Sequence, residues 1–127
     1  MSSCRRSSAQ IVPYAPPVHP LTPAHVAWVR SQRDNGAMAL YALGDKTPDI
    51  DPTAFVHPDA VIIGDVRVGP ESSVWPTAVL RGDHGSIVVG SQTSIQDGTI
   101  VHCTDKQDTI IGDRCVVGHN AHLEGCR

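Results

Sequence analysis

The sequence predicts an all-β fold, a parallel β-helix built from six-residue repeats, on the strength of two observations. From Ala54 onward, aliphatic residues recur every six positions: Val56, Ile62, Val68, Val74 and Leu80, then Val89, Ile95 and Val101, then Ile111, Val117 and Leu123. Most of them are followed four positions later by a small or short residue: Ala60, Val66, Ser72, Ala78, Thr93, Thr99, Cys115 and Ala121. An amphipathic helix needs apolar residues at spacings of three and four, and in an antiparallel strand apolar and polar residues alternate for longer before a turn. Neither explains an aliphatic residue at every sixth position.

Each coil of such a β-helix has three short strands and takes about eighteen residues. Successive coils stack about 4.8 Å apart. The chain has 127 residues with one Phe, two Tyr and two Trp, which suits a narrow core of aliphatic side chains. Residues 38–127 are therefore expected to form one β-helix domain.

Residues 1–37 are rich in Ser, Arg and Pro and show little periodicity, which predicts a disordered extension. This segment carries four arginines against Asp34 alone, so it could be an organellar transit peptide. The alternative that we favour is that translation begins at Met38. Residues 38–127 carry six basic and twelve acidic side chains, which argues against nucleic acid as a partner.

The four cysteines, Cys4, Cys103, Cys115 and Cys126, lack the CxxC spacing of a zinc ribbon or a redox site. No apolar segment resembles a secretion signal or is long enough to span a bilayer. We therefore expect reduced thiols in a cytoplasmic protein that does not bind membranes.

Two insertions interrupt the six-residue period. The step from Leu80 to Val89 is three residues too long, and the step from Val101 to Ile111 is four too long. Each insertion predicts a loop at a corner of the β-helix, formed by residues 82–86 and 104–108. Loops on a rigid scaffold often carry function.

Subtracting the insertions places Arg81, His102 and Glu124 one coil apart in turn, so these three side chains should stack in one outward column. The same count predicts a second column of Pro76, Asp97 and His119, and a third of Trp75, Gln96 and Gly118. Polar groups should therefore gather at outward edges beside both insertions.

Possible metal ligands are concentrated in the last part of the chain. His102, His119, His122 and Glu124 fall within 23 residues, and imidazole with carboxylate is a ligand set for zinc or ferrous iron. The alternative is an ordinary His–Glu ion pair on a solvated face. Because His119 belongs to a different column from His102, a neighbouring subunit's His119 could complete the site if the chains form a trimer.

Several segments closely resemble gamma-class carbonic anhydrases and their homologues over Leu40 to Cys126. They are residues 79–83 (VLRGD), 95–98 (IQDG), 101–102 (VH), 111–113 (IGD), 118–119 (GH) and 125–126 (GC). The resemblance implies a left-handed β-helix, a homotrimer with zinc or ferrous iron held by three histidines between subunits, and reversible hydration of CO2 to bicarbonate.

By position, His102 and His119 match two of the family's three ligands. Glu124 occupies the position of the third family ligand. Three alternatives follow: Glu124 is itself a ligand, His122 takes the place of the third histidine, or the metal site is degraded. Residues 122 and 124 flank inward-facing Leu123, so both should point outward.

Other positions also match the family. Arg81 and Asp83 resemble residues that hold neighbouring subunits in register, and Gln96 and Asp97 resemble residues that hydrogen-bond at the metal site. The alternative for these residues is turn chemistry. His84 stands where some members carry a proton-transferring glutamate, and an imidazole could move protons there.

Two other functions compete with carbonic anhydrase activity. One is a non-catalytic scaffold or metal-binding protein, and the other, less favoured, is a hexapeptide-repeat acyltransferase. Family members usually continue for several more coils and a C-terminal helix, so we expect a β-helix cut short after Arg127.

Overall fold

The computed structural model describes residues 38–127, so the predictions for residues 1–37 lie outside the described residues. Within this part the structure contains eleven strands and no helix, which confirms the all-β prediction. The strands are β1 (Ala39–Tyr41), β2 (Asp49–Ile50), β3 (Phe55–Val56), β4 (Val61–Val68), β5 (Ser73–Val74), β6 (Val79–Val89), β7 (Ser94–Ile95), β8 (Ile100–His102), β9 (Thr109–Ile111), β10 (Val116–Val117) and β11 (His122–Glu124).

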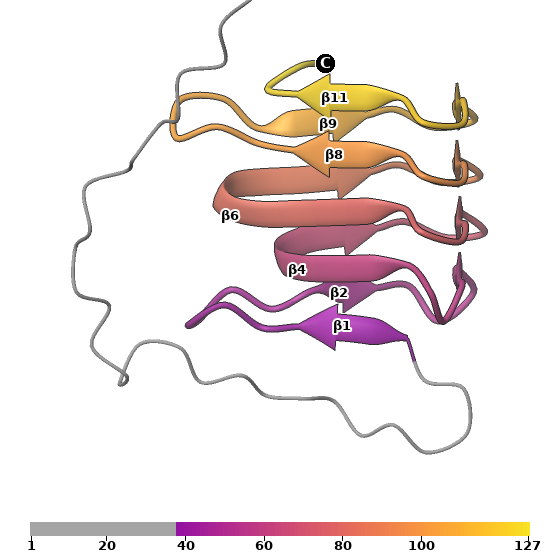
Figure 1. Ribbon diagram of the computed structural model, residues 1–127, viewed down its shortest axis with the longest axis horizontal. Helices are drawn as coiled ribbons and strands as arrows, with labels where there is room; N and C mark the ends of the chain where they lie inside the picture. Colours follow the sequence, from indigo (N-terminus) through magenta and orange to yellow (C-terminus); the bar gives the residue numbers. More distant parts are fainter. Residues whose placement is uncertain (1–37) are drawn as a thin grey trace, which may run out of the picture.

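The strands are stacked in parallel coils, with β1 at one end of the stack and β11 at the other (Figure 1). One sheet runs in the order β1-β4-β6-β8-β11, with β2 also paired to β4 and β9 to β6. A second sheet runs β10-β7-β5-β3. All of these strand pairs are parallel, as a β-helix requires.

The six-residue period forms the core. The aliphatic positions from Val56 to Val101 are at most 5% exposed, and Ile111 is 6% exposed. Val117 and Leu123 are partly buried and pack against this core. Stacking follows the predicted coil length, because Ile62 pairs with Leu80 and Leu80 with Val101.

The short residues between the aliphatic positions connect one coil to the next. Ser72 donates its hydroxyl to the Gly90 carbonyl at 2.7 Å. Thr93 donates to the Gly112 carbonyl at 2.7 Å. A small hydroxyl side chain therefore fits the core and also satisfies a backbone acceptor of the neighbouring coil.

The two insertions differ in structure. The prediction of a separate loop was wrong for the first, because β6 continues through it and bends. Residues 83–86 stand opposite Asp65 alone, between the pairs Gly64–Gly82 and Val66–Ile87. The bend keeps its hydrogen bonds, with the Ser86 amide donating to Asp108 at 2.8 Å. The second insertion, residues 104–108, is a loop between β8 and β9 as predicted.

Candidate functional site

His102 is the centre of the candidate site and lies at the end of β8. Its neighbours in the stack are Arg81 on β6 and Glu124 on β11, which confirms the predicted column. Val101 and Leu123 point inward, so the alternation of the strands directs the intervening side chains outward. Side chains from three coils therefore meet at one edge.

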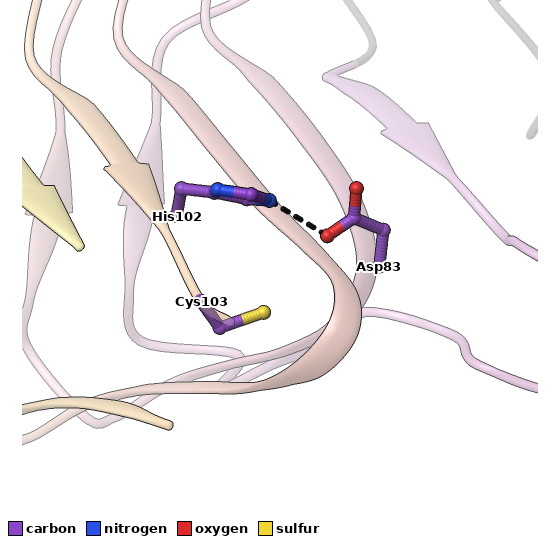
Figure 2. Close-up of side chains that lie close together, drawn as sticks. All are labelled: Asp83, His102 and Cys103. Carbon is purple, nitrogen blue, oxygen red and sulfur yellow. Dashed lines mark hydrogen bonds and ion pairs between the residues drawn. The ribbon is translucent and has the colours of Figure 1, made fainter. Parts of the chain in front are cut away.

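Two carboxylates hold the His102 ring. The Nδ1 atom lies 2.9 Å from Oε1 of Glu124, and the Nε2 atom lies 2.8 Å from Oδ1 of Asp83. Figure 2 shows the second contact, with Asp83 facing the ring from the bend of β6. The His102 and Asp83 side chains are only 17% and 15% exposed, whereas Glu124 is 42% exposed. The Asp83 side of the ring is thus the drier one.

Asp83 is held as a carboxylate by its surroundings. Partial burial opposes its ionisation, but hydrogen bonds from His102 and from the His84 amide, with the charge of Arg81, outweigh burial and lower the pKa of Asp83. The His84 amide donates to Oδ1 at 2.9 Å, and the Arg81 guanidinium forms an ion pair with Oδ2. Arg81 and Asp83, predicted as subunit-interface residues, thus also contact each other within one chain.

Lys46 supports the same bend and was missed by the sequence analysis. Its Nζ donates to the backbone carbonyl of Asp83 at 2.6 Å and to that of His84 at 3.2 Å. It lies between β1 and β2, 37 residues before Asp83. No motif or repeat position marks Lys46, because its role depends on how the segment between β1 and β2 reaches past the second coil to the bend of β6.

Cys103 lies beneath the ring and was predicted only to be a reduced thiol. It is fully buried, and its Sγ accepts a hydrogen bond from the Gly85 amide at 3.2 Å. Single ligand atoms of Asp83, His102 and Cys103 all lie within 4.8 Å of one another. Figure 2 shows the three side chains grouped at the bend of β6. Cys103, Cys115 and Cys126 form no disulfide in this part of the chain.

A pocket of about 430 Å³ opens beside these residues. It is lined by His84, His102, Cys103, Thr104, Asp105 and Glu124. His84, predicted to move protons, is exposed at this pocket, and both insertions contribute to its wall. A small molecule or an ion could therefore reach His102 from solvent.

The remaining predicted residues lie in two groups. His122 Nε2 is 3.8 Å from Oε2 of Glu124, so this carboxylate stands between two imidazoles. His119 is 63% exposed and pairs with Asp97 at 3.1 Å between Nδ1 and Oδ2, in the second column as predicted. Gln96 is half-buried on the neighbouring third column, where its backbone N–H donates to the Val117 carbonyl. One chain thus brings together His102, His122 and Glu124 and leaves His119 apart.

The chemistry of this donor set fits zinc or ferrous iron. Imidazole nitrogens and a carboxylate are suitable ligands for both ions. The contacts around Glu124 supply two such nitrogens and one carboxylate, whereas His119 lies apart from them, exposed and paired with Asp97. The residues present are therefore compatible with a metal centre.

Comparisons with known proteins find close sequence and structural relatives over part of their length. The carnitine operon protein CaiE of Escherichia coli O157:H7 is 48% identical over 89 residues, which are 70% of this chain and 45% of that protein. A hexapeptide transferase family protein from Anaplasma phagocytophilum is 46% identical, with a TM-score of 0.60 over 64% of this chain and 47% of that one. A Bacillus cereus protein provisionally named an acetyltransferase is 35% identical, with a TM-score of 0.70 over 73% and 54%.

The fold is thereby identified as the left-handed parallel β-helix of hexapeptide-repeat proteins. The chain spans about half the length of the relatives that it matches. No protein-family model matches it. Residues 38–127 contain no helix that is long and apolar enough to cross a membrane.

Proposed function

We propose that the protein binds zinc or ferrous iron at His102, Glu124 and His122, with His119 of a neighbouring subunit completing the site in a homotrimer. The proposed reaction is the reversible hydration of CO2 to bicarbonate, as in the gamma-class carbonic anhydrases that the sequence resembles. The free thiols favour a reducing compartment, so we place the protein in the cytoplasm.

The observation that carries this proposal is the position of the Glu124 carboxylate. It stands 2.9 Å from His102 and 3.8 Å from His122, beside a pocket open to solvent. Glu124 occupies the family's third ligand position, and His122 was the alternative. Their proximity allows both to serve, so the two alternatives need not exclude each other.

The chain's own residues prepare His102 for this role. In this proposal the proton of the neutral His102 ring lies on Nε2, where the Asp83 carboxylate accepts it, and the Nδ1 lone pair on the Glu124 side is left for the metal. Arg81 and the His84 amide keep Asp83 ionised, and Lys46 holds the bend in place. Such outer contacts orient a ligating histidine and raise its basicity.

Proton movement and substrate orientation fall to neighbouring side chains. A metal ion in this kind of site supplies a bound water with a pKa near 7. His84 is exposed at the pocket and can carry a proton to solvent. Gln96 and Asp97 stand on adjacent columns, from which they would hydrogen-bond near the bound water at a subunit interface.

Acyl transfer is the second candidate, favoured by the names of the two structural relatives at 46% and 35% identity. That reaction needs a histidine to act as a general base. His84 suits this role better than His102, whose two nitrogens both face carboxylates. An assay of acetyl-CoA consumption with amine and alcohol acceptors tests this candidate.

The first experiment on the main proposal measures metal per chain by elemental analysis, on the full chain purified without chelator and sized by light scattering. About one ion per chain in a trimer, with CO2 hydration lost after chelation, is the expected result. A trimer that binds metal without hydrating CO2 would indicate a metal-binding scaffold. A metal-free monomer would exclude both the carbonic anhydrase and the metal-binding scaffold.

A mixing experiment tests the shared site. His102→Ala and His119→Ala chains should each be inactive, but after unfolding and refolding together roughly a quarter of the sites should contain both histidines. Recovered activity supports a site between subunits. If mixing restores nothing, while each variant still forms trimers, His119 does not complete the site. His57→Ala, which removes a histidine paired with Asp59 elsewhere, is the matched control.

A further inference from the structure

His102 has a hydrogen-bonding mismatch that points to a cation on its buried side. A neutral imidazole has one N–H and one lone pair, whereas ionised carboxylates only accept. Glu124 and Asp83 approach the two nitrogens at 2.9 and 2.8 Å, so a neutral ring can satisfy one of them only. Either a second proton or a metal ion must lie beside the other nitrogen.

The need for a compensating cation is greater at the nitrogen that faces Asp83, because that side of the His102 ring is more buried. Glu124 is 42% exposed and can turn to water, whereas Asp83 and His102 are 15% and 17% exposed. If Glu124 accepts the Nδ1 proton, then Nε2 presents its lone pair to Asp83. A carboxylate on the far nitrogen is the usual outer partner of a metal-bound histidine.

A third donor lies at the same place. The Sγ atom of Cys103 is within 4.8 Å of ligand atoms of Asp83 and His102. Its hydrogen bond from the Gly85 amide, at 3.2 Å, would stabilise a thiolate, whereas its own donation to the Arg81 carbonyl, at 3.7 Å, would be given up on metal binding. Only glycine fits at residue 85, where the backbone amide approaches the Cys103 sulfur. A Cβ there would lie 2.7 Å from the Asp108 carboxylate and 2.9 Å from the Thr104 carbonyl.

We propose that Asp83, His102 and Cys103 form a metal site within a single chain, for a thiophilic divalent cation such as zinc. Nitrogen, oxygen and sulfur ligands at 2.0 to 2.3 Å from a tetrahedral ion stand about 3.5 Å apart. Nε2 of His102 and Oδ1 of Asp83, now 2.8 Å apart, would therefore separate slightly, and the Cys103 sulfur would approach them by up to roughly 1 Å. His102 and Cys103 also line the pocket, from which a water molecule would supply the fourth ligand. Binding releases the thiol proton of Cys103 to solvent.

This site goes beyond the proposed function, because it uses Nε2 of His102 and needs no second subunit. The site between subunits uses Nδ1 with Glu124 and His122. One neutral imidazole can offer only one lone pair, so the two modes of binding exclude each other on the same chain. The intrachain site would load the monomer, and the shared site would require assembly.

Cobalt(II) is the probe that separates them, because a thiolate ligand produces an intense sulfur-to-cobalt charge-transfer band in the near ultraviolet. We expect cobalt titration of the metal-free full chain to give this band, saturating at one ion per chain. Cys103→Ser should abolish it, whereas Cys115→Ser and Cys126→Ser, the matched controls, should keep it. His119→Ala should also keep it, because the neighbour's imidazole takes no part.

Asp83→Asn and His102→Ala cover the case in which Cys103→Ser does not fold, since both leave the thiol in place. We expect at least about tenfold weaker cobalt binding for either variant. Cobalt that binds without a charge-transfer band, or a band that survives Cys103→Ser or disappears in a control, overturns the intrachain site. None of these three results decides the shared site, which is judged by its dependence on His119 and by CO2 hydration.

Discussion

Replacing Lys46 by Met tests whether the site depends on a support outside the repeat motifs. Methionine keeps the apolar stem and removes the ammonium group that donates to the Asp83 and His84 carbonyls at 2.6 and 3.2 Å. A hydrogen bond involving a charged group contributes about 1.5–3 kcal/mol. The second contact is exposed and longer, so we count only the first and expect Lys46→Met to lose about 1.5–3 kcal/mol of folding free energy.

Lys46→Met should also weaken metal binding at the site of Asp83, His102 and Cys103, because the two carbonyls fix the backbone that carries the Asp83 carboxylate. Urea unfolding at neutral pH measures the stability, and cobalt titration measures the affinity, which we expect to fall about tenfold. Lys106→Met, in the exposed loop of the second insertion, is the matched control and should change neither. If the two variants agree in stability within about 0.5 kcal/mol, or cobalt affinity is unchanged, the supporting role assigned to Lys46 is refuted.

Three further outcomes follow from the core and from Asp83. Leu80→Ala, at a fully buried position in the centre of the stack, should lower the free energy of unfolding in urea by about 2–5 kcal/mol. Val88→Ala, at a half-buried outward position, should lower it clearly less, and equal losses would contradict the assignment of Leu80 as inward-facing. Thr93→Val removes a hydroxyl that donates a hydrogen bond to one backbone carbonyl of the next coil and accepts one from a backbone amide of that coil. The substitution should lower stability by about 1–3 kcal/mol in thermal unfolding, whereas Thr47→Val, at an exposed position, should be nearly neutral. The folded-state pKa of Asp83 is lowered from 3.8, so its carboxylate stabilises the fold fully above that pH and this contribution is lost as pH falls through the lowered value. The stability difference between wild type and Asp83→Asn should therefore shrink on acidification in chemical denaturation, and a difference that grows in acid would reverse the assigned sign.

The repeat predicted most of the fold because its rule is local. Every sixth side chain must enter a core too narrow for large aromatic residues, so the period could be read without knowing any contact. The same arithmetic predicted that Arg81, His102 and Glu124 stack, and the register confirms it. The bend of β6 was not foreseen, because counting residues reveals an insertion but not the hydrogen bonds that keep it within a strand.

What the sequence by itself determined was the periodic part of the protein: the β-helix, its inward positions and the columns of outward side chains. Only the tertiary structure decided which atoms meet around His102. Lys46 and Cys103 reach the site through the packing of separate coils, and Asp83 reaches it through a bend outside the period. The physical reason is that repeat spacing sets which face a residue occupies, whereas hydrogen bonds and ligand contacts depend on side-chain directions at irregular places, which no period specifies.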